Sequence, residues 1–180
     1  MAELWDLYDK DRNPLHMTHT RGKRLRKGTY HLAVGIWTVC DDNRLLLTLR
    51  SPEKRDWPNT WENTAGSVLM GETARQGAVR ELREETGLLV AEEELTLLGT
   101  ECGKNAIGDC FAVRKSFTLE DIVFQEGETV DAKLVTFAEL DEMIRQDLVA
   151  YPVAYRLKTV RAALESFIAA TDPNRKEPNP

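Results

Sequence analysis

The stretch "GSVLMGETARQGAVRELREETGL", from Gly66 to Leu88, places three glutamates within five positions near its end. Glu81, Glu84 and Glu85 stand at positions i, i+3 and i+4, which share one face of an α-helix. Like charges at these spacings destabilise a helix by about 0.2–0.5 kcal/mol per pair. The last two also lie at the C-terminal end of the helix, where its dipole disfavours acids. The segment therefore gathers negative charge where an isolated helix would avoid it.

Local signals place a helix inside this stretch. Thr73 and Gln76 match a capping box, which predicts that the helix begins near Thr73. Gly87 is a typical left-handed stop, so we expect the helix to end near Thr86. Gly77 costs about 1 kcal/mol against alanine and is tolerable if another group packs closely on it. The apolar face is formed by Ala74, Ala78, Val79 and Leu82.

Two interpretations fit the three glutamates. One is a solvated acidic face with Arg–Glu pairs, in which Arg80 reaches Glu84, and charge spacing alone favours it because charge runs on helices are common. The other is a site for a hard divalent cation, since Mg²⁺ prefers oxygen ligands such as carboxylates.

The wider spacing decides between them. From Gly66 to Leu88 the chain follows the pattern G-x5-E-x7-R-E-U-x-E-E-x-G-U, with U aliphatic, at every specified position. This long, gapless pattern is the Nudix box, and the chain therefore resembles the Nudix hydrolase family. The strands and helices predicted around the box fit that family from about residue 29 to 150.

The resemblance implies an α/β (α+β) fold, a Nudix-type α/β/α sandwich with a mixed sheet and a loop–helix–loop catalytic segment. We expect a single domain over residues 1–170 and a disordered, Pro-rich tail over 171–180.

Turn signals predict a hairpin over 4–15. Further strands are expected in 30–40, 43–50, 61–66, 95–102, 110–119 and 131–137, and helices in 138–148 and 151–170. The last helix carries an apolar stripe of Val153, Leu157, Val160, Leu164 and Ile168.

The resemblance also implies the site. The metal ligands would be Glu81, Glu84, Glu85 and the backbone carbonyl of Ala65. Glu81, Glu84 and Arg80 would be catalytic, with Arg80 holding a glutamate in place and pairing with Glu72. Which carboxylate activates the water stays open. Family members often add an acid from outside the box, for which Glu128 is the candidate, with Glu126 and Asp131 behind it.

The implied reaction is hydrolysis of a small-molecule diphosphate, most often a nucleoside diphosphate derivative, by water with Mg²⁺ or Mn²⁺. Phosphoryl transfer needs positioning and charge neutralisation, which a metal ion supplies. The alternative is a non-catalytic nucleotide-binding or sensing module. A degenerate box is typical of that class, whereas all three glutamates are present here.

A second, looser resemblance concerns "NRLLLTLRSPEKRDWPNTWENTAGS", which is similar to the branch related to isopentenyl-diphosphate isomerase. The isomerase's catalytic cysteine and metal-binding histidine fall on Ala65 and Ser67 here, so we reject isomerisation. Arg50 and Lys54 precede the box and are candidate substrate-binding cations, with a solvated surface as the alternative. Trp57 is left out of the site, because tryptophan more often anchors a loop or core.

Composition and charge limit the partners and the location expected for this protein. A net charge of −6 argues against nucleic acid as the main partner, and the basic loop 21–28 is interpreted as a solvated connector. The three cysteines form no CxxC pair and are expected to be reduced. No signal peptide or membrane-length apolar run is present, so we expect a cytoplasmic protein with no membrane partner. Homodimerisation is left open.

Overall fold

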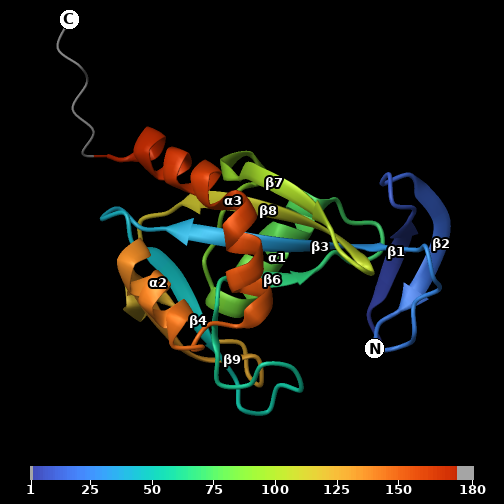
Figure 1. Ribbon diagram of the computed structural model, residues 1–180, viewed down its shortest axis with the longest axis horizontal. Helices are drawn as coiled ribbons and strands as arrows, with labels where there is room; N and C mark the ends of the chain where they lie inside the picture. The colour runs from blue at the N-terminus through green and yellow to red at the C-terminus, as the bar shows by residue number, and fades with distance from the viewer. Residues whose placement is uncertain (1, 174–180) are drawn as a thin grey trace, which may run out of the picture.

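Strand β3 (His31–Val39) is the centre of the structure, a computed structural model that describes residues 2–173 (Figure 1). A seven-stranded sheet runs in the order β5-β4-β3-β8-β7, with β6 paired to β3 and β9 paired to β4. Strands β3 and β8 are parallel and the other pairs in this sheet are antiparallel, which confirms a mixed sheet. The remaining strands are β1 (Leu4–Tyr8), β2 (Pro14–Thr20), β4 (Leu45–Arg50), β5 (Trp61–Glu62), β6 (Thr64–Ser67), β7 (Thr96–Cys102), β8 (Ala106–Arg114) and β9 (Thr129–Val135).

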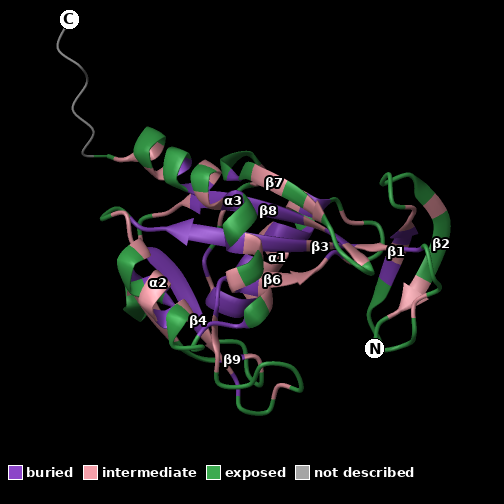
Figure 2. Ribbon diagram, in the orientation of Figure 1, coloured by how far each residue is buried: buried purple, intermediate pink, exposed green. Residues whose placement is uncertain are grey.

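Helices cover both faces of this sheet. They are α1 (Ala74–Thr86), α2 (Phe137–Arg145) and α3 (Tyr151–Thr171), with short 3₁₀ turns η1 (Glu92–Glu94) and η2 (Leu119–Asp121). Because side chains alternate along a strand, Val34 and Ile36 of β3 pack with α1, whereas Trp37 packs with α2 and α3. Figure 2 shows the resulting buried centre along β3 and β4. The α/β/α sandwich predicted from the sequence is confirmed.

The N-terminal hairpin β1–β2 forms a separate two-stranded sheet at one end of the sandwich (Figure 1). A bridge between Tyr8 and Tyr30 joins it to the segment that enters β3. Arg12 fixes its tip through a bidentate ion pair with Asp109 of β8, at 2.8 and 2.5 Å. The hairpin is therefore held against the sheet by both backbone and side-chain contacts.

Helix α1 begins and ends where the sequence predicts. Thr73 is the N-cap and forms a complete capping box with Gln76, and Gly87 takes the left-handed conformation with φ 76°. Gly77 faces Val68, whose Cγ2 would lie 3.2 Å from a Cβ at this position. Close packing thus accounts for a glycine within the helix. Ala74, Ala78 and Leu82 are buried as expected.

Several element bounds differ from the sequence-based expectation. The segment expected as one strand over 61–66 is divided, because β5 pairs with β4 whereas β6 pairs with β3. The strand expected over 110–119 ends at Arg114, and Phe137 begins α2 rather than ending a strand because Thr136 caps that helix.

Strand β8 begins at Ala106 rather than Cys110, because it pairs in parallel with β3 from His31 onward. The buried stripe of α3 ends in Phe167 rather than Ile168, since a helix contact surface advances in alternating steps of four and three residues. Helix α3 includes Thr171, where the tail was expected to start, and residues 174–180 lie outside the described part of the chain.

Cys40, Cys102 and Cys110 are all free thiols, and Cys102 faces Ile107 across the β7–β8 pair. None of the helices within residues 2–173 has the length and apolar composition of a membrane span.

Leu82→Ala tests the packing of α1. Leu82 is fully buried between α1 and the sheet, so its truncation is expected to lower the free energy of unfolding by about 2–5 kcal/mol. Urea denaturation followed by circular dichroism measures the loss. The matched control is Leu89→Ala, where the side chain is 65% exposed and a change within about 0.5 kcal/mol is expected. Equal losses in the two variants would contradict this packing.

Candidate active site

A polar cavity of about 160 Å³ lies beside α1, where β6, the loop after β4 and the segment before β9 meet. Every site residue predicted from the sequence lines it. The full lining is Glu3, Arg21, Arg50, Lys54, Ala65, Gly66, Arg80, Glu81, Glu84, Glu85, Gln125 and Glu128. The fold thus brings residues of the box together with side chains from four other parts of the chain.

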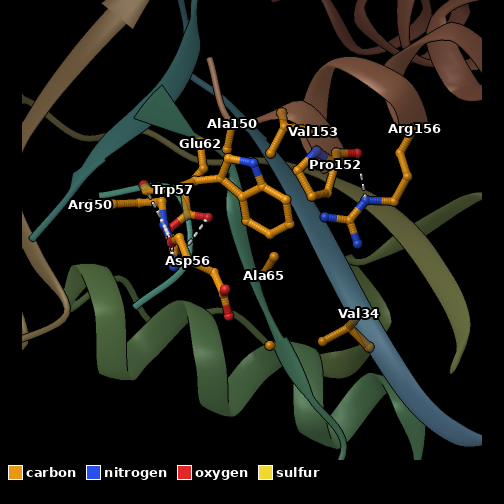
Figure 3. Close-up of a pocket in the computed structure, with 11 residues that line it drawn as sticks. Val34, Arg50, Asp56, Trp57, Glu62, Ala65, Ala150, Pro152, Val153 and Arg156 are labelled. Atoms are coloured by element: carbon orange, nitrogen blue, oxygen red, sulfur yellow. Dashed lines mark hydrogen bonds and ion pairs between the residues drawn. The ribbon is translucent and has the colours of Figure 1, made fainter. Parts of the chain in front are cut away.

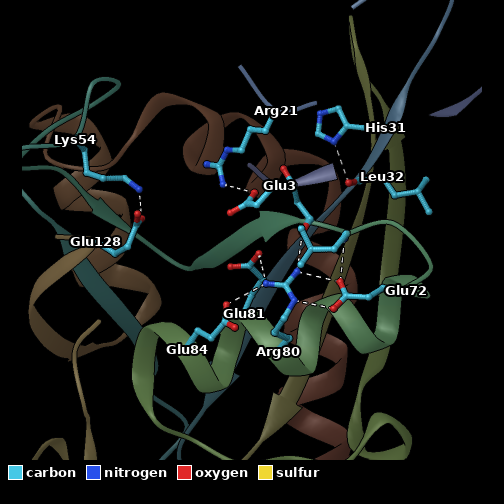
Figure 4. A network of polar contacts seen from close by, with 12 residues as sticks. Glu3, Arg21, His31, Leu32, Lys54, Glu72, Arg80, Glu81, Glu84 and Glu128 are labelled. Carbon is cyan, nitrogen blue, oxygen red and sulfur yellow. Dashed lines mark hydrogen bonds and ion pairs between the residues drawn. The ribbon is translucent and has the colours of Figure 1, made fainter. Parts of the chain in front are cut away.

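Arg80 is the hub of this cavity (Figure 4). Its Nε donates to Glu72 Oε1 at 2.8 Å, and its Nη1 donates to Glu81 at 2.9 Å and to Glu84 at 3.1 Å. Its Nη2 donates to the carbonyl of Ser67 at 2.9 Å. One guanidinium therefore ties α1 to the loop before it and holds two of the predicted metal ligands.

Gly66 leaves room for the side chain of Glu81. A Cβ on Gly66 would collide with the Glu81 carboxylate, so only a glycine lets that carboxylate lie against β6. Burial raises the pKa of Glu81 and the neighbouring Glu84 adds to this rise, while Arg80 opposes it. The first residue of the box therefore has a steric role.

Glu85 is the most unusual acid in the cavity. Only 6% of it is exposed, and its Oε2 has no hydrogen-bond partner among the described residues. Burial raises its pKa well above the usual range, and the nearby charges of Glu62, Glu81 and Glu128 raise it further. A buried carboxylate oxygen without a partner is costly unless a cation or proton reaches it.

Glu128 faces α1 from the other side of the cavity and forms an ion pair with Lys54 (Figure 4). The two other acids considered from the sequence, Glu126 and Asp131, are exposed and are not part of the lining. Within residues 2–173, no three His, Cys, Asp or Glu side chains are gathered tightly enough to hold a metal ion as they stand. Among these residues, Arg80 pairs with Glu81 and Glu84 and Lys54 pairs with Glu128, whereas Glu85 has no such partner.

Arg50 is engaged by the protein. Its Nη1 donates to both oxygens of the buried Glu62, at 2.6 and 2.8 Å. Its Nε and Nη2 donate to the carbonyls of Asp56 and Trp57. These contacts fix the loop between β4 and β5, and the assignment of Arg50 to substrate binding stays a prediction.

A second cavity of about 250 Å³ shares Arg50, Ala65 and Gly66 with the first (Figure 3). Trp57 lines it, is 46% exposed and has a strained φ of 48°, which is rare for a bulky residue. Its other walls are Val34, Asp56, Glu62, Ala150, Pro152, Val153 and Arg156. The position of Trp57 on an open cavity differs from the loop or core anchor expected from the sequence.

Arg156 enters this second cavity from α3. Its Nε donates to the carbonyl of Pro152 at 3.1 Å, and no carboxylate in the described part of the chain forms an ion pair with it. The cavity therefore combines an aromatic face, an unpaired guanidinium and apolar walls.

Sequence reasoning missed several lining residues. Glu3 and Arg21 form an ion pair at 2.7 Å and come from the hairpin, and Gln125 comes from the turn before β9. Glu62 supports Arg50 from β5. Arg21 lies in the basic loop that was interpreted as a solvated connector, and Glu62 lies in the stretch similar to the isomerase branch, but neither pattern singles out these residues. Glu3 and Gln125 belong to no local motif.

Comparison with known proteins agrees with this geometry. The model of the NUDIX domain family matches residues 29–156. The chain is 34% identical over 147 residues to an uncharacterized Nudix hydrolase of Listeria monocytogenes, covering 78% of this chain and 84% of the relative. The chain therefore belongs to the Nudix family. It is a hydrolase that acts on pyrophosphate bonds, as its family and relatives indicate.

Solved structures show the same fold. A protein from Deinococcus radiodurans superposes with a TM-score of 0.73 at 18% identity, covering 88% of this chain and 99% of that one. The NUDIX domain of Shewanella oneidensis NrtR, solved with ADP ribose, gives a TM-score of 0.59 at 18% identity, covering 75% and 88%. Similarity to the isopentenyl-diphosphate isomerase of Salmonella heidelberg, 36% identity, reaches 34% of this chain and 35% of the isomerase, so that branch is only weakly indicated.

The burial of Glu85 predicts a dependence of stability on pH. Its pKa in the folded protein lies above the unfolded value of about 4.5, so the folded state binds the proton more tightly. The contribution of protonated Glu85 to the free energy of unfolding is complete below about pH 4.5. It is lost as the pH rises toward the raised pKa of Glu85 in the folded protein. Glu85→Gln removes that loss and is expected to raise the free energy of unfolding at pH 8 in EDTA, with a gain that shrinks toward pH 4.5.

Urea titrations between pH 4.5 and 8 measure this gain. Glu93→Gln changes an exposed acid of η1 and serves as the control, with a change within about 0.5 kcal/mol at every pH. A gain for Glu85→Gln that does not vary with pH would contradict the assigned burial of the charge.

Proposed function

We propose that this hydrolase cleaves the diphosphate of a nucleoside diphosphate derivative, using Mg²⁺ or Mn²⁺ and a water molecule that attacks phosphorus. The observation that carries the proposal is the buried, unpartnered oxygen of Glu85 beside Glu81, Glu84 and Glu128. Carboxylates gathered at this cost suit a site that binds a divalent cation.

The donor set fits a hard cation. Glu81, Glu84, Glu85 and Glu128 supply carboxylate oxygens around one cavity, and the backbone of Ala65 lines the same space. Mg²⁺ and Mn²⁺ both accept such oxygen ligands. A bound divalent cation supplies two kinds of chemistry, since it lowers the pKa of water and offsets charge on phosphate oxygens.

The protein's own groups prepare that chemistry. Arg80 holds Glu81 and Glu84 through its two Nη1 contacts, so both carboxylates are positioned at the cavity before a metal binds. The acids would have to close around the ion, because no three of them in the described part of the chain stand close enough to hold it as they are. A carboxylate of the cluster accepts the proton of the attacking water, and the choice among them is left open. Lys54 and Arg21 add positive charge at the same cavity, where phosphate oxygens would lie.

The second cavity gives the proposal its substrate class. Trp57 offers a flat aromatic face beside Ala65 and Gly66, and Arg156 offers an unpaired guanidinium. A nucleobase stacks on such a face and presents acceptors to arginine. The structure of the distant relative solved with ADP ribose is consistent with a nucleoside diphosphate substrate. The proposed partner is thus a small molecule, and homodimerisation stays an open prediction. The free thiols support a cytoplasmic location.

Glu84→Gln tests the metal site. Removing one ligand charge is expected to reduce kcat by two or more orders of magnitude, roughly 3 kcal/mol or more, because charge neutralisation dominates phosphoryl transfer. Release of phosphate or nucleotide is measured across a panel of nucleoside diphosphate derivatives with Mg²⁺, Mn²⁺ or EDTA. Glu93→Gln is the control and should keep full activity. Full activity of Glu84→Gln, or activity in EDTA, would refute the metal role.

Trp57→Ala tests the nucleoside subsite. Loss of base stacking is expected to cost about 1–3 kcal/mol, a drop in kcat/KM of roughly 5- to 150-fold, carried mainly by KM. Trp57→Phe keeps an aromatic face and should retain most of the activity. An alkyl diphosphate without a ring serves as the comparison substrate, and its hydrolysis should be unchanged. A similar drop for both substrates would assign Trp57 to loop structure alone.

A further inference from the structure

A larger cavity of about 1060 Å³ lies at the end of the molecule where the N-terminal hairpin meets the sheet. Four of its lining residues belong to the basic loop, namely Lys23, Arg24, Arg26 and Lys27. It shares no lining residue with the carboxylate cavity of the active site. The volume is at the upper end of the range for small-molecule sites, roughly 300–1,000 Å³.

The fold brings a fifth cation to this cavity. Lys104 stands in the turn between β7 and β8, far from the loop in sequence, and it lines the same cavity. The backbone N–H of His31 donates to the carbonyl of Asn105 at 3.2 Å, which ties that turn to the chain entering β3. The positive charge is therefore assembled by the fold as well as by a run of basic residues.

These cations have no acidic partners. Within residues 2–173 no ion pair involves Lys23, Arg24 or Arg26, and the same holds for Lys27 and Lys104. The lining contains no aspartate or glutamate. This occurs in a chain whose net charge is −6. A concave surface of one sign concentrates ions of the opposite sign, so the cavity favours an anion.

The inner wall of the cavity is aromatic. Trp5 is 91% buried, since its exposed fraction is 9%, and it stacks on His31 with ring centroids 4.0 Å apart and planes 16° apart. Tyr30 lies beside them in the lining. The indole N–H of Trp5 is buried and has no acceptor among the described residues. This N–H is not accessible from the cavity as the structure stands, so the wall offers a ligand the half-buried side chains of Tyr30 and His31 instead.

We propose that this cavity binds a nucleoside polyphosphate at a second site, separate from the site of hydrolysis. The phosphates interact with the five cations, and the base packs against the aromatic wall at Tyr30 and His31. Charge-assisted hydrogen bonds to arginine and lysine supply the main attraction. The solvated-connector interpretation of loop 21–28 accounts for the charge of the loop itself but not for Lys104, which the turn between β7 and β8 adds to the same cavity.

Calorimetric titration in EDTA tests the proposal with two probes, the non-hydrolysable analogue adenosine 5′-(β,γ-imido)triphosphate and inorganic tripolyphosphate. The subsite proposed at Trp57 and Arg156 can hold the base without a metal, so the titration is repeated on Trp57→Ala, and binding that persists in that variant reports the second site. We expect one molecule of the nucleotide analogue to bind per chain, more tightly than tripolyphosphate, because only the nucleotide uses the aromatic wall.

Charge variants locate the binding. Lys23→Gln with Arg24→Gln is expected to weaken binding of the analogue at least about tenfold, since two charge-assisted contacts are lost. Lys104→Gln should weaken it several-fold, which a simple basic loop would not explain. The matched control, Lys115→Gln with Lys158→Gln, removes the same charge outside the cavity and should stay within about twofold. Tyr30→Ala removes part of the aromatic wall, so it should weaken binding of the nucleotide analogue and leave binding of tripolyphosphate unchanged.

Several results would overturn the proposal. The first is no binding in EDTA, and the second is equal weakening by the control variant. The third is full affinity for the nucleotide analogue in both Lys104→Gln and Tyr30→Ala. Binding of a single-stranded RNA oligomer with the same variant pattern, in the absence of nucleotide binding, would replace the small ligand with a nucleic acid.

Discussion

The guanidinium of Arg80 is the contact on which the active site depends. The box helix gathers Glu81, Glu84 and Glu85 on one face, an arrangement that repulsion alone would disfavour. Arg80 offsets part of that repulsion by bonding Glu72, Glu81 and Glu84 and also reaches the carbonyl of Ser67. Since these partners lie both on the helix and on the chain leading into it, one side chain fixes the helix against β6 and positions the acids. The capping box at Thr73 and the stop at Gly87 then set the helix length, so that the acids lie in its final turns.

Glu85 is the acid of the box helix whose charge Arg80 does not offset. It is buried at the cavity, and its Oε2 has no hydrogen-bond partner among residues 2–173. A structure selected for stability alone would replace this group with a neutral one, because an unpaired buried charge is destabilising. Its presence therefore points to an occupant that the chain does not itself supply. A divalent cation fits, since the neighbouring acids are oxygen donors held within reach of one cavity.

Local patterns in the sequence predicted the parts of the structure that depend on local physics. The capping box and the glycine stop gave the correct helix, the apolar runs gave the strands β3 and β4, and the long spacing from Gly66 to Leu88 identified the family. The sequence could not predict contacts that depend on tertiary approach. Arg50 looked like a free cation, and its partner Glu62 comes within reach only through the β4–β5 pair, in which Glu62 faces Thr48. Trp57 looked like a packing residue, and only the folded loop shows its ring at a cavity.

The hairpin divides the molecule's charge into two regions. Glu3 and Arg21 line the carboxylate cavity, whereas Trp5 and Lys23 line the basic one. Trp5 is only two positions after Glu3, and Lys23 is only two positions after Arg21. An anion is attracted directly to the basic cavity, whose cations have no acidic partners. The acidic cavity accepts a diphosphate only after cations have neutralised its carboxylates. Under the two proposals, one class of phosphorylated ligand would therefore bind this chain at two sites. Binding at the acidic cavity would need a divalent metal, and binding at the basic cavity would not.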